Sequence, residues 1–202
     1  VVTTLEGWKD AYQQFTEAGW TSLIFDPAFG GQGLPRVVGG AVQEMWDASN
    51  MSFGLCPLLT QSASEAIWQC GSTEQKRVYL SKLVSGEWAG TMNLTEPQAG
   101  SDLSAVRTRA DPTAAGHYLI NGQKIWTSYG HKADWIFVLV RTDFEAAKHD
   151  GISLVLVDMA QPGVTTRPIK LLSGMSHFCE TFFDDARCEV DNVVGDLNRG
   201  WT

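Results

Sequence analysis

A short polar run at residues 92–102 has the residue types and spacing most suited to holding a flat or charged ligand. It closes an apolar, strand-like stretch, and Pro97 then ends strand pairing because proline has no N–H to donate. The small residues after Pro97 leave backbone N–H groups free, and the hydroxyls of Thr95 and Ser101 can donate or accept. Such a loop suits a ring or a phosphate. The alternative is an ordinary strand-to-loop turn with a Ser/Asp cap, and this run alone favours neither.

A second motif follows at residues 121–128. Asn121-Gly122 predicts a hairpin turn. The strand after it should place Trp126 and Ser128 on one face, because they are two residues apart. A tryptophan beside a hydroxyl suits clamping an aromatic ring and hydrogen-bonding one of its heteroatoms. An ordinary hairpin with a half-buried tryptophan is the alternative, but two such motifs in one predicted sheet favour a binding site.

Other motifs are weak. Gly31-Gln32-Gly33 resembles part of a dinucleotide fingerprint, but the third glycine and the βαβ context are missing. His177 and Cys179 would share one face of a strand, yet no second pair completes a metal site. The sequence also lacks a G-x-S-x-G elbow. We therefore predict neither a metal site nor a serine nucleophile.

The elements that must position these motifs change type near residue 88. Apolar residues recur at helical spacing over residues 5–20, 37–46, 58–70 and 73–83. Thr73 with Lys76 gives only a partial capping box, and Glu74 favours a helix start there. Short runs rich in β-branched and aromatic residues follow, separated by turn residues. These predicted strands are 91–95, 106–110, 118–120, 135–141, 152–158, 165–170 and 178–183.

We therefore predict an α+β fold in which an N-terminal helical bundle precedes a small antiparallel β-barrel or sandwich. The helical domain is assigned to residues 1–87, truncated at its start, and the β-domain to residues 88–202. No helices alternate with the strands, which argues against a parallel Rossmann sheet.

The composition of the chain limits the classes of partner and the cellular compartment that we expect. The chain has 202 residues, 44% of them hydrophobic, and a net charge of −8. This charge argues against a nucleic-acid partner, and no apolar run is long enough for a membrane span. Four cysteines without a C-x-x-C pair fit a reduced, cytoplasmic protein. The chain starts with Val1 and not with Met, so a lost leader, and with it the mitochondrial matrix, is the alternative.

At this point the chain resembles the acyl-CoA dehydrogenase family. The resemblance covers nearly the whole chain and rests on stretches at matching spacing. In the second half these are 94–102, 120–126 and 182–195, and in the first half 29–33 and 71–76.

The resemblance implies a fold of three domains that hold FAD between them: helical, middle β and C-terminal helical. Thr95 would hydrogen-bond the pyrimidine edge of the flavin, Trp126 would pack against the ring, and Ser128 would bond near N5. Ser101 would lie by the pyrophosphate and the CoA part of the substrate. The full set of implied cofactor-binding residues is Met92, Asn93, Leu94, Thr95, Gly100, Ser101, Trp126, Thr127 and Ser128.

The implied reaction removes a proton from Cα and a hydride from Cβ of an acyl-CoA thioester. The carboxylate base for the proton is expected beyond Thr202, and Glu96 is expected to be structural, so we assign no catalytic residue here and expect this chain alone to be inactive. The resemblance also implies an electron acceptor such as an electron-transfer flavoprotein, and a homodimer or homotetramer. Alternatives are an acyl-CoA oxidase or flavin monooxygenase of the same fold, a non-catalytic flavin-binding module, or a tryptophan-rich carbohydrate-binding sandwich.

Overall fold

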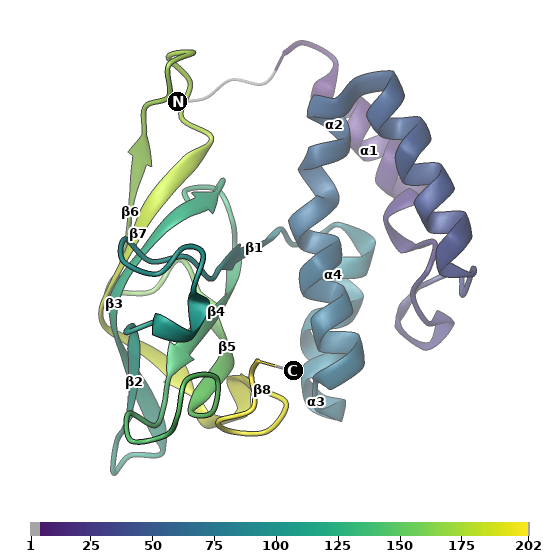
Figure 1. Cartoon of the computed structure of the whole chain (residues 1–202). Helices are drawn as coiled ribbons and strands as arrows, with labels where there is room; N and C mark the ends of the chain where they lie inside the picture. Colours follow the sequence, from purple (N-terminus) through teal and green to yellow (C-terminus); the bar gives the residue numbers. More distant parts are fainter. Residues whose placement is uncertain (1–4, 202) are drawn as a thin grey trace.

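The computed structural model describes residues 5–201, in which a helical half precedes a half built of strands (Figure 1). The helical half has two main helices, two short 3₁₀ turns, and three short helical segments at its end. Its elements are α1 (Trp8–Glu17), η1 (Trp20–Ser22), η2 (Pro27–Phe29), α2 (Arg36–Cys70), α3 (Thr73–Gln75), the π-helical turn η3 (Lys76–Leu80) and α4 (Ser81–Ser85). Among residues 5–201, none of these helices combines the length and hydropathy that a membrane span requires.

The long helix α2 joins two segments that the sequence predicts separately. Its backbone leaves the helical region at Asn50, with φ −159° and ψ 94°. The Asn50 side-chain oxygen accepts a hydrogen bond from the Phe53 N–H at 3.1 Å. Asparagine in this position caps a helix N-terminus, so α2 is two helices joined at a kink.

The helix start near residue 73 differs from the sequence prediction by one residue. Ser72, and not Thr73, is the N-cap, and its hydroxyl accepts the Gln75 N–H at 3.1 Å. The Gln75 side chain in turn accepts the Ser72 N–H at 2.9 Å. A complete capping box therefore replaces the partial one predicted from Thr73 and Lys76.

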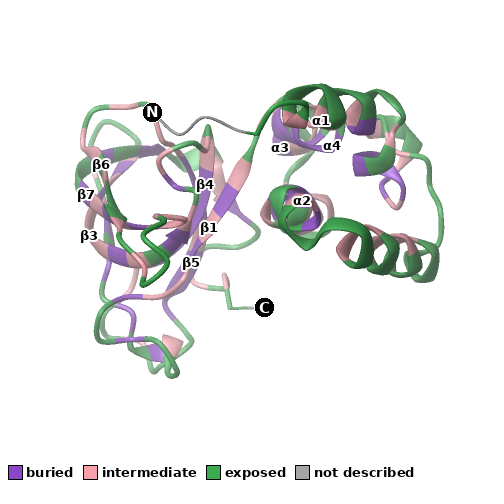
Figure 2. Ribbon diagram, turned by 90° about the horizontal axis from the view of Figure 1, so that it is seen from above, coloured by how far each residue is buried: buried purple, intermediate pink, exposed green. Residues whose placement is uncertain are grey.

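The second half is one sheet of eight strands with the order β6-β7-β3-β2-β4-β5-β8, and β1 pairs with β4. The strands curve around a shared interior, beside the helices (Figure 2). Two 3₁₀ turns, η4 (Leu103–Ala105) and η5 (Val190–Asn192), interrupt them. The strands are β1 (Gly90–Asn93), β2 (Arg109–Pro112), β3 (His117–Ser128), β4 (Trp135–Arg141), β5 (Ile152–Asp158), β6 (Val164–Ile169), β7 (Phe178–Glu189) and β8 (Val193–Val194).

The predicted fold class, a helical part followed by a small β-domain, is confirmed, with two differences in the sheet. The pairs β1–β4 and β2–β4 are parallel, so the sheet is mixed and not purely antiparallel. The sheet is also open: within the described range the strand order begins at β6 and ends at β8, with no ladder joining them.

The hairpin predicted at Asn121-Gly122 is wrong. Both residues lie inside β3, which pairs with β7 along its length and shifts register between Ile120 and Gly122. Gly122 has φ +153°, and a Cβ there would lie 2.6–2.8 Å from Thr108 atoms. The glycine is therefore needed for close packing, and the β2–β3 turn lies at Thr113–Gly116 instead.

Three buried clusters hold these elements together. One fills the interior of the curved sheet, with Ile136, Val138 and Val140 of β4 facing inward. A second joins the other face of β4 and β5 to the helices, where Phe137 and Leu156 meet residues such as Ile67 and Leu80. Because β4 is covered on both faces, it is apolar along most of its length. A third, smaller cluster lies under the loop after β1.

The predicted domain boundary between residues 87 and 88 falls in the connection from α4 to β1. It stays a prediction, because the second cluster contains residues from both halves. The predicted outer bounds, residues 1 and 202, lie outside the described residues.

Candidate functional site

The fold brings the two motifs at 92–102 and 121–128 side by side. The Ile125 N–H donates to the Thr95 carbonyl at 3.0 Å, and the Thr91 hydroxyl donates to the Ser128 carbonyl at 2.6 Å. The end of β1 and the loop after it thus run along the last residues of β3. Segments 30 residues apart in the sequence therefore form one continuous surface.

The loop after β1 is compact. Glu96 and Ala99 exchange two backbone hydrogen bonds of 3.1 and 3.0 Å, which close a tight turn over Pro97 and Gln98. Ala99 is buried against Leu139 and Ile152. This turn lifts Gly100 and Ser101 to the exposed surface.

Asp102 ends the loop and caps the following 3₁₀ turn. Its carboxylate accepts the Ser104 N–H at 3.0 Å and the Ser104 hydroxyl at 2.5 Å. These two bonds lower the pKa of Asp102. The Ser/Asp cap that the sequence left as an alternative is therefore present, and it coexists with an exposed loop.

Trp126 lies at a bulge in β3. Its φ is 65°, and the β3–β7 register shifts between Lys124 and Thr127. The extra residue turns the indole outward, where 51% of Trp126 is exposed and its ring meets the edge of Phe178 at 6.0 Å. A positive φ is uncommon for a bulky residue, and such backbone conformations cluster at functional sites.

Several polar groups on this surface have no partner within the described part of the chain. They are the hydroxyls of Thr95, Ser101 and Ser128 and the indole N–H of Trp126, none of which takes part in a hydrogen bond among residues 5–201. All four groups are donors, and the three hydroxyls also accept. The surface thus offers donors beside an aromatic face.

Other predicted site residues point inward. Asn93 and Thr127 are buried, and the Asn93 side-chain amide donates to the Thr127 hydroxyl at 2.5 Å. That hydroxyl also bonds to Thr181 at 2.7 Å. Met92 and Leu94 are half-buried against the second and third clusters. Their side chains support the surface, and their contact with a ligand would come through the backbone.

One pair that the sequence reasoning missed lies beneath this surface. Lys124 and Glu96 form a buried ion pair with an Nζ–Oε1 distance of 2.8 Å. A sequence signal existed, since Lys124 has the same parity in β3 as the buried Tyr118 and Ile120. The expectation that Glu96 is structural agrees with this pairing.

The side chains of His177 and Cys179, considered above as a pair of metal ligands, have different partners and do not face a common site. His177 Nδ1 lies 3.1 Å from the Tyr129 hydroxyl, whereas Cys179 lies 3.1 Å from His131 Nδ1. Burial raises the pKa of the Cys179 thiol, against hydrogen bonds from the His131 and Gly130 N–H groups. Across residues 5–201, no group of three or more His, Cys, Asp or Glu side chains is suited to a metal ion.

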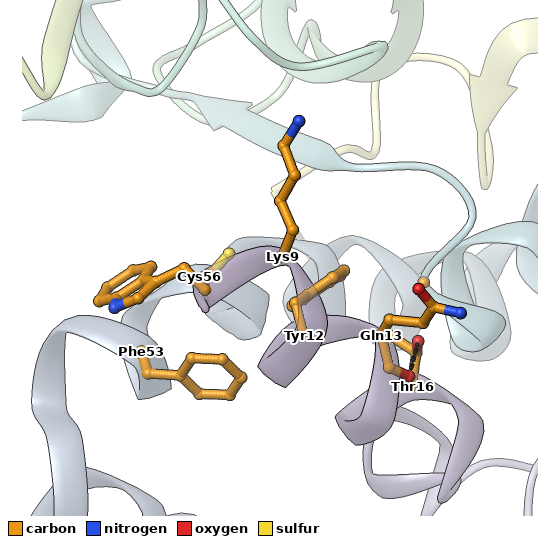
Figure 3. Close-up of a pocket in the computed structure, with 8 residues that line it drawn as sticks. Lys9, Tyr12, Gln13, Thr16, Phe53 and Cys56 are labelled. Atoms are coloured by element: carbon orange, nitrogen blue, oxygen red, sulfur yellow. Dashed lines mark hydrogen bonds between the residues drawn. The ribbon is translucent and has the colours of Figure 1, made fainter. Parts of the chain in front are cut away.

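A cavity of about 440 Å³ lies elsewhere, between α1 and α2. Figure 3 shows Tyr12 and Phe53 on its walls, with Lys9 extending away from the helices. None of the predicted site residues lines this cavity. We therefore take the surface at Thr95 and Trp126, and not the cavity, as the candidate site.

Comparisons with known proteins agree with this geometry. The family model for the N-terminal domain of acyl-CoA dehydrogenases matches residues 4–87. The model for the middle domain of the same family matches residues 91–186.

Individual relatives point the same way. The chain is 55% identical to 3-methylmercaptopropionyl-CoA dehydrogenase of Ruegeria pomeroyi over 125 residues, which are 62% of this chain and 21% of that protein. It is 37% identical over 198 residues to acyl-CoA dehydrogenase IpdE1 of Mycolicibacterium smegmatis, covering 94% of this chain and 50% of the relative. The matched residues thus cover only 50% of the length of the second relative and 21% of the length of the first.

A solved structure matches the whole arrangement. Butyryl-CoA dehydrogenase from Megasphaera elsdenii superposes with a TM-score of 0.87 at 28% identity, covering 96% of this chain and 52% of that one. The arrangement of helical half and sheet is therefore that of a known enzyme fold.

Proposed function

Since the chain belongs to the acyl-CoA dehydrogenase family, we propose that it forms the helical and β-sheet parts of an FAD-dependent enzyme. The enzyme would oxidise an acyl-CoA thioester between its α and β carbons. The proposal includes the division into a helical domain at residues 1–87 and a flavin-facing β-domain at residues 88–202.

The juxtaposition of Thr95 with the Trp126–Ser128 segment carries this proposal. A flavin ring needs an aromatic or apolar face to pack on and donors for its ring heteroatoms. The exposed Trp126 indole offers the face. The Thr95 and Ser128 hydroxyls, unpartnered in the described range, offer the donors. The residues present therefore fit the group.

The residues that would hold FAD are those that line this surface or support it. Thr95 and Ser128 would donate to the flavin ring, and Trp126 would pack against it. Ser101, exposed on the loop after the tight turn, would lie near the pyrophosphate and the CoA part of the substrate. Backbone groups would complete the set through Met92, Asn93, Leu94, Gly100 and Thr127.

Bound FAD would supply the two-electron acceptor for the hydride that leaves Cβ. The task of this chain is then to orient the ring and to stabilise the negative charge that develops on it. Donors held in fixed positions do this without the cost of reorganisation during the reaction. Thr95 is fixed in this way, because its carbonyl is tied to β3.

The proton from Cα needs a carboxylate base, and Glu96 does not serve. Its Oε1 accepts from Lys124 at 2.8 Å and from the Thr108 N–H at 2.9 Å. Its Oε2 accepts from the Arg107 N–H at 2.7 Å and from Gln98 at 2.5 Å. Both oxygens are buried and each already accepts two hydrogen bonds. We therefore propose that the base belongs to a part of the enzyme outside these 202 residues.

The partners follow from the same proposal. The reduced enzyme would pass its electrons to an acceptor such as an electron-transfer flavoprotein, and it would assemble as a homodimer or homotetramer. Its proposed location is the cytoplasm, with the mitochondrial matrix as the alternative.

The test compares the full-length protein with the 202-residue chain. Each is incubated with FAD, a panel of acyl-CoA thioesters and an artificial electron acceptor. We expect turnover with the full-length protein and none with the short chain. A full-length protein that binds no flavin, or a short chain that turns over, contradicts the proposal.

A second measurement separates a dehydrogenase from an oxidase of the same fold. The full-length enzyme is reduced by its substrate and then exposed to oxygen in a stopped-flow instrument. Slow reoxidation is expected of a dehydrogenase, whereas rapid formation of hydrogen peroxide indicates an oxidase.

A further inference from the structure

The buried ion pair between Glu96 and Lys124 lies directly beneath the candidate flavin surface. The two side chains are 2% and 0% exposed. Removing two charges from water is costly, and the attraction between them offsets this cost only when further hydrogen bonds satisfy both groups. The hydrogen bonds of a buried ion pair therefore indicate which segments of the chain the pair holds in place.

Lys124 reaches from β3 to the chain that follows β1. Its ammonium donates to the Leu94 carbonyl at 3.0 Å and to Glu96 at 2.8 Å. The residue next to it in β3, Ile125, donates its N–H to the Thr95 carbonyl. Three successive residues of the loop, 94–96, are thus bound to two successive residues of β3.

Glu96 binds the same loop to a third segment. Its two oxygens accept the N–H groups of Arg107 and Thr108, which precede β2. It also accepts from Gln98 inside the tight turn. The carboxylate therefore closes the loop 97–106 at its base, with the exposed Gly100 and Ser101 between its ends.

Both groups stay charged near neutral pH. Burial lowers the pKa of Lys124 to about 8, while the Glu96 carboxylate opposes that shift. For Glu96, burial acts to raise the pKa, but Lys124 and the two backbone donors outweigh it and the pKa is lowered. The charges thus keep the directional hydrogen bonds that an apolar pair would lack.

We propose that Glu96 and Lys124 are positioning residues, which set the Thr95 hydroxyl and the Gly100–Ser101 turn at a fixed place relative to Trp126 and Ser128. This inference rests on the proposed function, since it concerns the geometry of the flavin surface. Apolar side chains of similar volume often replace a buried ion pair without loss of stability. They cannot, however, anchor the Leu94 carbonyl or the two N–H groups.

Substitutions can separate the stability that an apolar pair keeps from the loop anchoring that it loses. In the full-length protein we compare Lys124→Met, Glu96→Gln and the double variant Glu96→Met/Lys124→Met. Arg187→Met, which breaks an exposed ion pair with Glu189 on β7, is the matched control. For each apoprotein we measure the melting temperature, the Kd for FAD by fluorescence titration, and hydrogen–deuterium exchange over residues 92–102.

We expect the double variant to recover part of the melting temperature that Lys124→Met loses, because it removes the uncompensated Glu96 charge but leaves the Leu94 carbonyl and the two N–H groups unpaired. It should still bind FAD on the order of 10- to 100-fold more weakly and exchange faster over 92–102. Glu96→Gln, which keeps the shape of the side chain, should show a smaller change of the same sign. Arg187→Met should match the wild type in all three measurements.

A folded double variant with wild-type FAD affinity and wild-type exchange over 92–102 would overturn the proposal. If the double variant does not fold, unchanged exchange over 92–102 in Glu96→Gln overturns it equally. Failure of the proposed function looks different. In that case the wild-type protein itself binds no FAD, and the exchange over 92–102 still decides whether the pair fixes the loop.

Discussion

At the scale of single residues, the candidate site combines side chains with opposite roles. Trp126 and Thr95 carry polar groups without a hydrogen-bond partner among residues 5–201, whereas Asn93 and Thr127 are buried and bond to each other. The first pair is expected to contact the cofactor directly. The second pair keeps β1 and β3 in register.

Substitution of the first pair tests this division. We expect Trp126→Ala and Thr95→Ala, each in the full-length protein, to raise the Kd for FAD about fivefold, because each removes a contact of about 1 kcal/mol. Trp20→Ala is the control, since Trp20 is also exposed but lies in the helical half. Unchanged flavin occupancy in both site variants would count against the assignment.

The buried Glu96 also predicts a pH dependence. Its folded pKa lies below the ordinary value of 4.5, so the stability it contributes is present above pH 4.5 and is lost as pH falls through the folded pKa. We expect Glu96→Gln to lower the free energy of unfolding by about 3 kcal/mol at neutral pH. The difference from wild type should shrink as pH falls below 4.5. Urea unfolding across this range measures it, and a difference that grows toward acid pH would contradict the assignment.

At the scale of elements, the sequence was a good guide where patterns are local. The apolar run 135–141 predicts β4 within its observed bounds, and the run 152–158 predicts β5. The strand that precedes the loop, β1, and the Trp126 segment of β3 were also correctly placed in one sheet. These features follow from residue type alone.

The failures share one cause, which is contact between distant segments. Asn121-Gly122 has the composition of a turn, but the approach of Thr108 to Gly122 is what requires the glycine. The parallel pairing of β1 with β4 joins segments 45 residues apart at the Gly90–Trp135 pair. The parity of Lys124 in β3 indicates that its side chain is buried, but its pairing with Glu96 depends on the geometry of a distant loop.

Two glycines test this explanation of Gly122. Gly122→Ala should lower the free energy of unfolding by about 1–3 kcal/mol, because its Cβ would overlap Thr108. Gly40→Ala, in an open position of α2 with nothing within 4 Å, should raise it by about 1 kcal/mol. Chemical denaturation of both variants gives the values, and a neutral Gly122→Ala would restore the possibility of a flexible turn.

At the scale of the whole molecule, the two halves share more than a peptide connection. The side chain of Gln75, in the capping box, donates to the Asp191 and Val193 carbonyls at 2.6 and 2.8 Å. The Tyr79 hydroxyl bonds to Asn192 at 2.8 Å. Together with the second cluster, these bonds fasten the helices to the end of the sheet.

The halves should therefore unfold together. We expect coincident transitions for helix content by far-UV circular dichroism and for tryptophan fluorescence. Gln75→Ala should lower the free energy of unfolding measured by both signals by about 2–3 kcal/mol, because it removes two hydrogen bonds to part-buried carbonyls. Ser72→Ala, which removes only the cap, should cost about 1 kcal/mol. Two separate transitions in the wild type would instead support independent domains.

The placement of Asn121 inside β3 also bears on how the protein ages. An Asn-Gly pair in a mobile turn deamidates readily, because the glycine nitrogen swings round to attack the asparagine side chain. Here the Asn121 amide is held on both sides by Asp185, at 2.8 and 2.9 Å, and the chain is fixed in a strand. The folded protein should thus resist this damage, and the mass change of deamidation should accumulate at residue 121 only when the sheet opens.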